Sequence, residues 1–377
     1  MSPWIYLASM NRKPCVSCTQ VLVAVTLLLS SCLVSACATS PAITTATPPA
    51  LAKELILYDY QDDMPQSVLD AFKKEYGVSV SYPVYDSSEE AMEHIQSGET
   101  YDVVVMDSRL VPSLVQDHLL TEIDYRQVTN FKNISPNFRD LAYDPENKHC
   151  IPFNWGTTGL VVRSDLVSSP ITSWNDLWDP RYAHHVAIWS TQEREVIALT
   201  LKALGFSANS TKPAELEKVR EKLLELRPNV RFLEDYDVID SSPAMSSGDI
   251  ALSMGYALDA LAGREKNDHI TYVLPKEGAL MWGDTFVIPA NSSRKYTAEV
   301  FLNFVLRPDI NAQIANANRY ATPNEPARAF ILPEILNDPV IFPPNQDIKR
   351  AELELPISAE GQKLYDDIWQ QFMAAGN

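Results

Sequence analysis

The periodicity and the length of the sequence predict an α/β fold divided into two lobes. Short apolar segments typical of strands alternate with amphipathic segments typical of helices, which is the pattern of a mainly parallel sheet flanked by helices. Over 300 of the 377 residues follow the N-terminal segment, and a globular part of that size usually makes two lobes. Of the five cysteines only Cys150 lies in that part, so burial of apolar side chains rather than a disulfide must stabilise it.

The first elements are indicated by residues that mark helix ends. Residues 55–58 are apolar and predict a strand. The next helix is expected to begin at Pro65 and to end before Gly77, because proline suits a first helical turn and glycine suits the position just past the last one. Residues 78–84 predict a second strand, and a serine at 87–88 suits the N-cap of the helix that follows.

The same alternation continues along the chain. The run 102–106 is almost continuously apolar, as a strand buried on both faces of a parallel sheet requires. Further strands are expected at 159–162, 186–189, 250–254, 270–274 and 284–288. Helices are expected at 194–204 and 214–226. The last hundred residues are expected to be mainly helical, with loops around Pro323 and 343–344.

The N-terminal segment has the composition of an export signal. Arg12 and Lys13 precede an apolar run at 21–29, which is too short and too weakly flanked for a stable membrane span. The two basic residues are the only charges in that segment, so its removal would change the formal net charge from −18 to −20. So acidic a surface repels nucleic acid and anionic lipid, and we expect no nucleic-acid partner.

Two cysteines in this segment are candidates for lipidation. Each follows a stretch of small residues, which resembles the bacterial lipoprotein signal. We expect residues 1–37 to be a lipoprotein signal peptide lipidated at Cys37, or alternatively at Cys32, and residues 38–52 to be a flexible tether rich in Ala, Thr, Ser and Pro. An ordinary cleaved signal with incidental cysteines is the alternative.

Motifs for catalysis or cofactor binding are missing from the sequence. It contains no Gly-rich phosphate loop, no nucleophile elbow and no paired-His zinc helix. His184 and His185 are adjacent and therefore point apart on a helix or a strand. Cys150 follows His149 and is expected to be a small buried residue. We therefore predict no enzyme activity, no catalytic residue, no metal site and no cofactor.

The pair Trp282 and Asp284 is the strongest local indication of a binding site. The two residues lie two apart before the apolar run 286–288, and in a strand such residues point to the same face. An aromatic ring beside a carboxylate suits an organic ammonium ion, which gains a charge-assisted hydrogen bond and a ring face. The alternative is a buried tryptophan beside a solvent-facing or helix-capping aspartate.

From Glu54 onward the chain resembles the spermidine/putrescine-binding proteins of bacterial ABC importers. The resemblance rests on several segments in the same order, among them Asp102-Val-Val-Val, Ile151-Pro-Phe-Asn-Trp155-Gly156, Ser173-Trp174-Asn-Asp-Leu-Trp178, Arg194-Glu195-Val196, Trp282-Gly-Asp284 and Tyr320-Ala-Thr-Pro323. It implies a two-lobed type II periplasmic-binding-protein fold that closes on its ligand. The implied lobes are 53–156 with 284–323 and 157–283 with 324–377, joined by hinge strands near Trp155 and 282–284.

The resemblance also implies a pocket of acids and aromatic rings around a polyamine. Its ligand-binding positions fall on Tyr60, Asp62, Ser108, Glu195, Tyr256, Asp259, Trp282, Asp284 and Tyr320. A buried ammonium needs carboxylates or ring faces, and methylenes need flat apolar walls. The alternatives are that Glu195 and Asp259 serve only helix ends and that the aromatic residues are part of the core.

Four residues depart from the resemblance: Gln192, Asp63, Arg109 and Glu354. Arg109 would repel a polycation unless it pairs with Asp63 or Asp107 or turns outward. The departures leave spermidine, putrescine or another organic cation open as the ligand. The alternatives are a carboxylate or other metabolite anchored by Arg109 on the same fold, a secreted enzyme, and a lipoprotein that binds a protein partner.

The sequence thus predicts a monomeric, lipid-anchored receptor in the periplasm or on the outer face of the cell membrane. It would capture a polyamine between its lobes and deliver it to a membrane ABC permease, with lobe closure as its mechanism and no reaction of its own.

Overall fold

The computed structural model describes residues 49–233, 245 and 247–375. The paired strands run in the order β2-β1-β4-β10-β5-β8-β6-β7, with β3 beside β1, β9 beside β5 and β11 beside β10. The strands are β1 (Glu54–Tyr60), β2 (Ser79–Ser81), β3 (Val84–Tyr85), β4 (Val103–Asp107), β5 (Cys150–Arg163), β6 (Val186–Trp189), β7 (Val230–Leu233), β8 (Leu252–Tyr256), β9 (Ile270–Val273), β10 (Leu280–Val287) and β11 (Glu352–Leu353). The order brings strands from distant parts of the chain together.

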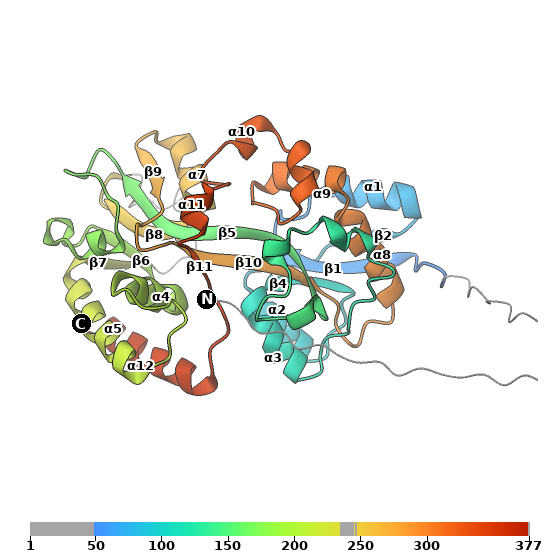
Figure 1. The fold of residues 1–377 in the computed structure, drawn as a ribbon, viewed down its shortest axis with the longest axis horizontal. Coiled ribbons are helices and arrows are strands. Elements are labelled where there is room, and N and C mark those ends of the chain that lie inside the picture. The colour runs from blue at the N-terminus through green and yellow to red at the C-terminus, as the bar shows by residue number, and fades with distance from the viewer. Residues whose placement is uncertain (1–48, 234–244, 246, 376–377) are drawn as a thin grey trace, which may run out of the picture. The chain divides into compact units, whose positions relative to one another are not determined.

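The helices pack around this array of strands (Figure 1). They are α1 (Gln66–Tyr76), α2 (Ser88–Gln96), α3 (Val111–Gln116), α4 (Glu193–Ala203), α5 (Pro213–Leu226), α7 (Ala257–Lys266), α8 (Lys295–Val305), α9 (Pro308–Asn318), α10 (Pro333–Leu336), α11 (Asn345–Ile348) and α12 (Ala359–Ala374). Among the described residues no helix is long and apolar enough to cross a membrane.

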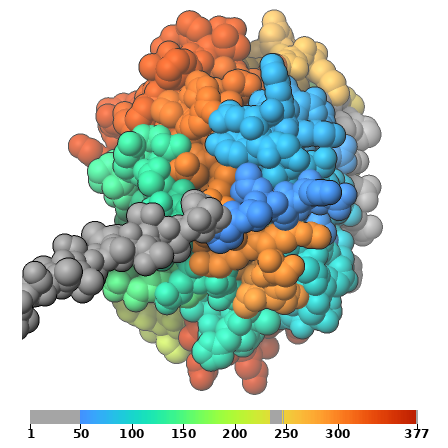
Figure 2. Space-filling view, turned by 90° about the vertical axis from the view of Figure 1, so that its right-hand side faces the viewer, coloured from blue at the N-terminus to red at the C-terminus, as the bar shows by residue number. Residues whose placement is uncertain are grey.

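The strands β2, β1 and β4 with α1, α2, α3, α8 and α9 form what we call the β1 side. These three strands are parallel, and their apolar residues pack with the helices in a cluster that includes Leu55, Phe72, Val105, Phe301 and Phe304. In Figure 2 the early segments of this side, in blue and teal, lie against its late segments, in orange, on one face. The β1 side is therefore built from segments that are not contiguous in the sequence.

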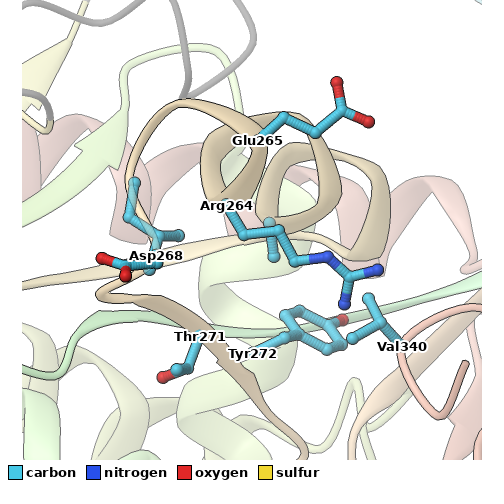
Figure 3. Close-up of a pocket in the computed structure, with 8 residues that line it drawn as sticks. Arg264, Glu265, Asp268, Thr271, Tyr272 and Val340 are labelled. Carbon is cyan, nitrogen blue, oxygen red and sulfur yellow. The ribbon is translucent and has the colours of Figure 1, made fainter.

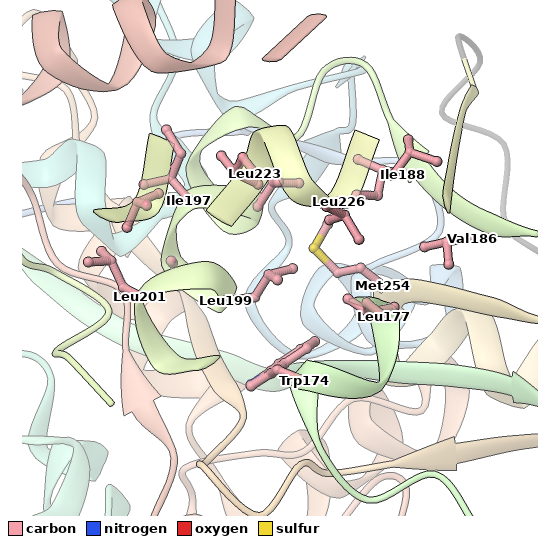
Figure 4. Close-up of a cluster of buried hydrophobic side chains, with 14 of the residues drawn as sticks. Trp174, Leu177, Val186, Ile188, Ile197, Leu199, Leu201, Leu223, Leu226 and Met254 are labelled. Carbon is pink, nitrogen blue, oxygen red and sulfur yellow. The ribbon is translucent and has the colours of Figure 1, made fainter. Parts of the chain in front are cut away.

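The strands β8, β6 and β7 with α4, α5, α7 and α12 form what we call the β6 side. These strands are also parallel to one another. A second apolar cluster lies here, with Trp174 fully buried among Leu177, Ile188, Leu199 and other side chains (Figure 4). Two separate cores of this kind agree with the α/β organisation expected from the sequence.

The long strands β5 and β10 connect the two sides (Figure 1). They pair antiparallel from Leu280 opposite Thr158 to Val287 opposite Cys150, with an irregularity between Asp284 and Thr285. The other edge of β10 pairs with β4, and β5 pairs onward with β8 and β9. The two strands thus form a continuous link from the β1 side to the β6 side.

Most expected elements are confirmed, including the ends of α1. Pro65 is its N-cap, and Gly77 follows its last residue with a left-handed φ of 72°. The N-cap of α2 is Ser87, whose Oγ accepts the N–H of Glu90 at 3.2 Å. The single strand expected at 78–84 is wrong, because the chain forms the short β2 and β3 on either side of Pro83. Proline lacks the N–H that an unbroken ladder needs.

The strand expected at 159–162 is only the end of a longer one, because β5 begins at Cys150 and is buried throughout. The mainly helical C-terminal region is confirmed by α8 to α12, with β11 as a short exception. The expected signal peptide 1–37, the candidate lipidated cysteines Cys37 and Cys32, and most of the expected tether lie outside the described residues.

Candidate functional site

The candidate site centres on Asp284, in the middle of β10. Its neighbours in the ladder are Asn154 on β5 and Asp107 on β4, so it lies where the connecting strands meet the β1 side. The residue is 8% exposed. Burial raises the pKa of Asp284 well above its usual range, and repulsion from Asp63 and Asp107 raises it further, while a hydrogen bond from Asn154 opposes the shift. This carboxylate lies among other acids.

Two more acids lie near Asp284, namely Asp59 within β1 and Asp63 shortly after it. Asp63 is buried, and its Oδ2 accepts a long hydrogen bond from Asn154 Nδ2 at 3.5 Å. Burial raises the pKa of Asp63 to about 7. Burial also raises the pKa of Asp59, and repulsion from Asp63 and Asp284 adds to the effect. Among the described residues, Asp63 and Asp284 form no ion pair, so this group favours an added positive charge.

Tyr60 supplies an aromatic wall beside these acids. Its Oη shares a hydrogen bond of 2.6 Å with Ser88 Oγ, and its ring packs edge-on against Tyr85. Burial raises the pKa of Tyr60 well above its usual range, with further contributions from Asp284 and then Asp107. The phenol therefore stays neutral and acts as a hydrogen-bonding ring next to the carboxylates.

Three aromatic rings line the adjoining surface. Trp282 lies between Tyr256 and Tyr320, with ring centroids 5.9 and 5.4 Å away and nearly perpendicular planes. Its indole covers Gly156, since a Cβ there would lie 2.2 Å from Trp282 Cζ2. All three rings are partly exposed, so they offer apolar faces and edges to a bound molecule. The expected sharing of one face by Trp282 and Asp284 agrees with their alternation on β10.

Glu195 approaches from the β6 side, in the first turn of α4. Its Oε1 accepts the hydroxyl proton of Tyr256 at 3.2 Å. Burial raises the pKa of Glu195, and the positive charge of Arg109 is the largest effect that opposes the rise. The structure thus brings Glu195, Tyr256 and Trp282 into one contiguous group, joined by a hydrogen bond and a ring contact.

Ser108, Asp62 and Asp259 are placed differently. Ser108 is buried next to Asp107 at the end of β4. Asp62 is exposed in the turn after β1, with a left-handed φ of 64°, and its neighbour Asp63 takes the buried position. Asp259 completes a capping box at α7, where its Oδ2 accepts the N–H of Tyr256 at 2.7 Å. Asp259 therefore caps a helix, which is the alternative to ligand binding that the sequence analysis gives for this residue.

The sequence names Asp63 and Glu354 only as departures from the resemblance and does not name Asn154 as a contributor to the site. Glu354 is 5% exposed, just beyond β11. Burial raises its pKa to about 8, repulsion from Glu195 adds to the rise, and Arg194 then opposes it. No local pattern marks this residue, since it stands in a run of alternating Glu and Leu that reads as an ordinary strand edge.

Arg109 is engaged within the protein. Its Nε donates to Asp107 Oδ2 at 2.9 Å, and its Nη2 donates to Glu89 Oε1 at 2.5 Å. The sequence analysis names this pairing with Asp107 as one of the arrangements in which Arg109 would not repel a cationic ligand. A carboxylate ligand anchored by Arg109 would have to compete with two carboxylates already in place.

Several polar atoms at the site are buried without a hydrogen-bond partner among the described residues: Ser108 Oγ, Asn154 Oδ1, Trp282 Nε1 and Glu354 Oε1. Unsatisfied buried polar groups are costly and rare in native proteins. Three of the four atoms are oxygens, which can accept hydrogen bonds from the N–H groups of an ammonium ion. These three acceptor oxygens therefore suit a nitrogen cation.

The described part of the chain gives little support for a metal site or for a site built on Cys150 and His149. No group of three His, Cys, Asp or Glu side chains there could hold a metal ion. Cys150 is fully buried, and burial raises its pKa, while His149 Nδ1 lies 3.3 Å from Asp144 Oδ1. The cysteine is thus the small buried residue that the sequence predicts, and its thiol is not exposed.

A separate pocket lies between α7 and β9 (Figure 3). Its lining includes Arg264, Glu265, Asp268 and Tyr272, and Arg264 pairs with Asp338. None of these residues belongs to the group around Asp284. Arg264 is bridged by Asp338 and Glu265 by Arg319, so two of the charged residues at this pocket already have ion-pair partners.

Comparisons with known proteins agree with this geometry. Residues 67–343 match the family described as bacterial extracellular solute-binding protein. The spermidine/putrescine-binding periplasmic protein of Escherichia coli (strain K12) is 33% identical over 323 residues, which cover 85% of this chain and 91% of that protein. The putrescine-binding periplasmic protein PotF of Escherichia coli (strain K12) is 30% identical over 323 residues, covering 80% of this chain and 86% of that protein.

A solved structure supports the same relationship. The spermidine/putrescine ABC transporter substrate-binding protein PotD from Streptococcus pneumoniae superposes with a TM-score of 0.79 at 30% identity, covering 86% of this chain and 100% of that chain. The expected two-lobed α/β fold of type II periplasmic binding proteins is thereby confirmed. The chain belongs to the bacterial extracellular solute-binding proteins, the family that the resemblance in its sequence implies.

Proposed function

We propose that this protein captures a polyamine between its two lobes and delivers it to a membrane ABC permease. The main support is the pair of buried carboxylates Asp63 and Asp284, which lack an ion-pair partner among the described residues. Partly exposed aromatic rings lie next to them. Carboxylates in this state are stabilised by an incoming ammonium, and the rings suit the methylenes between ammonium groups.

The energies involved are sufficient for a specific receptor. Each cation–π contact contributes about 0.5–2 kcal/mol, and a hydrogen bond to a charged group contributes about 1.5–3 kcal/mol. Micromolar affinity requires about 8 kcal/mol. Two ammonium groups that meet Asp284 and Glu195, together with contacts to Trp282, Tyr256 and Tyr320, supply interactions of this size.

We infer lobe closure because the acids that would bind the ligand belong to different lobes. We assign residues 53–156 and 284–323 to one lobe and residues 157–283 and 324–377 to the other. Asp63 and Asp107 then belong to the first lobe, whereas Glu195 belongs to the second. A ligand that contacts all three favours the closed arrangement over the open one, because only the closed one offers every contact.

The remaining parts of the proposal concern the setting. We assign the protein to the periplasm or the outer face of the cell membrane, anchored by a lipid on Cys37 or Cys32 and acting as a monomer. It performs no reaction and needs no cofactor. Names of relatives that bind spermidine or putrescine support this role, as does the acidic composition of the chain.

Thermal unfolding and titration calorimetry with putrescine, spermidine and succinate test the proposal. We expect either amine to bind with micromolar or tighter affinity and to stabilise the protein by about 2.7 kcal/mol at 100 times its dissociation constant. Succinate, a dianion, should have no effect. Stabilisation by succinate without stabilisation by the amines would instead favour a carboxylate ligand anchored by Arg109.

A glycine on β5 provides a second prediction. Replacement of Gly156 by alanine puts a methyl group 2.2 Å from the Trp282 ring, so the indole must move out of its place between Tyr256 and Tyr320. We expect polyamine affinity to fall by about tenfold, in line with the loss of one good ring contact. Titration calorimetry measures the effect, and near-ultraviolet circular dichroism reports the displaced indole.

The matched control is Gly283→Ala, on the strand that carries Trp282. There a methyl group meets nothing closer than Asn154 O at 3.5 Å, an ordinary contact. We expect this variant to bind polyamine within about threefold of the unaltered protein. Equal losses in both variants would mean that disturbance of the connecting strands, rather than the position of Trp282, limits binding.

A further inference from the structure

Arg109 brings a permanent positive charge to the candidate site. Its backbone N–H donates to Asp107 Oδ1 at 2.8 Å, and its Nε donates to Asp107 Oδ2 at 2.9 Å. The second bridge, to Glu89, fixes the other edge of the guanidinium. The side chain nevertheless remains 25% exposed, so its charge is held in a defined position and is still within reach of a bound molecule.

The charge of Arg109 extends to acids on the β6 side. It is the largest influence opposing the raised pKa of Glu195, and with Arg194 it opposes the raised pKa of Glu354. A guanidinium does not lose its proton in proteins. The part of the site formed by Asp107, Glu195 and Glu354 therefore contains the fixed positive charge of Arg109 before any ligand binds, and Arg194 adds a second one near Glu354.

The part of the site around Asp284 and Asp63 differs in charge. These two carboxylates repel each other, and Asn154 is the polar neighbour that offsets part of their burial. Among the residues that the structure describes, neither forms an ion pair. The site thus has an uncompensated acidic part at Asp63 and Asp284 and a partly compensated part at Arg109.

We propose that Arg109 acts as a built-in cation that restricts the ligand to a short aliphatic diamine. This inference rests on the proposed polyamine-binding function and names the ligand class within it. A diamine can place one ammonium at Asp63 and Asp284 and the other at Glu195 and Glu354. A third ammonium must approach the guanidinium, and like charges at short range in a partly buried site repel each other strongly.

Calorimetric titration of the purified protein with putrescine and spermidine tests this inference. We expect putrescine to bind at least about tenfold more tightly than spermidine. In Arg109→Gln the preference should shrink by at least about tenfold, mainly through tighter binding of spermidine. Arg109→Lys keeps a positive charge beside Asp107 and should retain most of the preference.

The matched control is Arg126→Gln on the same lobe. Arg126 pairs with Asp124 through the same Asp-X-Arg arrangement, with its Nε 2.8 Å from Asp124 Oδ1, but its side chain is 87% exposed and it lies apart from the site acids. Its replacement should leave the ratio of the two affinities unchanged. A change as large as that in Arg109→Gln would overturn the assignment to Arg109.

A ligand series keeps the test valid should Arg109→Gln fail to fold. Monoacetylspermidine has nearly the length of spermidine but carries two charges instead of three. At least one of its two isomers should bind the unaltered protein at least about tenfold more tightly than spermidine. Weaker binding of both isomers, or equal preference in the unaltered protein and Arg109→Gln, overturns this inference and leaves polyamine binding intact. Failure of both putrescine and spermidine to bind overturns the proposed function itself.

Discussion

Replacement of Asp284 by asparagine is expected to reduce putrescine affinity by at least about 100-fold, which corresponds to about 2.7 kcal/mol. The asparagine keeps the size of the side chain but removes the charge that an ammonium needs. Asp284 lies between Asn154 and Asp107 in the ladder and is the one acidic residue of β10, so the strand has no second carboxylate to replace it. Titration calorimetry measures the loss directly.

The unliganded Asp284→Asn protein should unfold at the same temperature as the unaltered protein or at a higher one. Burial and repulsion from Asp63 disfavour the charged form of Asp284, as its raised pKa indicates, and the variant removes that cost. Asp367→Asn, at an exposed position on α12, is the matched control and should keep full affinity. Retained affinity in Asp284→Asn would contradict the site, whereas a large loss of thermal stability would point to misfolding.

Polyamine affinity is expected to rise by about 3- to 30-fold from pH 6 to pH 8. The pKa of Asp63 is about 7 and that of Glu354 is about 8, so both carboxyls carry protons over much of this range. A bound ammonium favours the carboxylate and lowers the pKa of each group, so binding must release protons. Lowering the pH therefore opposes binding, and the amine keeps its own charge because its pKa lies near 10.

Calorimetry in buffers of different ionisation enthalpy measures the released protons at each pH. Glu354→Gln removes one titrating group and should reduce both the proton release and the slope of affinity against pH, whereas Asp367→Asn should change neither. An affinity that is flat or that increases toward pH 6 would contradict the assignment of these acids to the ligand.

The same groups affect the stability of the unliganded protein. Their pKa values in the folded state lie above those of an unfolded chain, near 4, so between pH 4 and pH 8 the folded state holds protons that the unfolded state has released. Their contribution to the free energy of unfolding is therefore largest at low pH and declines as the pH rises through 7 and 8. The acids that bind the ligand thus cost stability in its absence.

The sequence predicts those elements whose signals are local. Helix α1 follows from Pro65 and Gly77, and β6 follows from four consecutive apolar residues. The first part of β5 does not follow from a local pattern, because Pro152 and Gly156 interrupt its apolar run, and only the resemblance implies a strand near Trp155. That segment is a strand because it pairs with β10, more than 100 residues later in the chain, and pairing partners are invisible to a local pattern.

The site divides in the same way. The shared face of Trp282 and Asp284 follows from their spacing of two in a strand, which is a local property. Which of the adjacent acids Asp62 and Asp63 is buried does not follow from their spacing. The left-handed turn at Asp62 decides that Asp63 is the buried one. Glu354 enters the site only through the passage of the C-terminal segment beside β10, which brings β11 next to Met281.

The connecting strands β5 and β10 also determine what kind of motion the lobes can make. Consecutive hydrogen bonds tie the two strands together from Leu280 to Val287, so sliding of one along the other would break many bonds at once. Twisting of paired strands, by contrast, leaves their hydrogen bonds in place. We therefore expect the lobe closure proposed above to be a twisting of β5 and β10 rather than a sliding of one strand along the other.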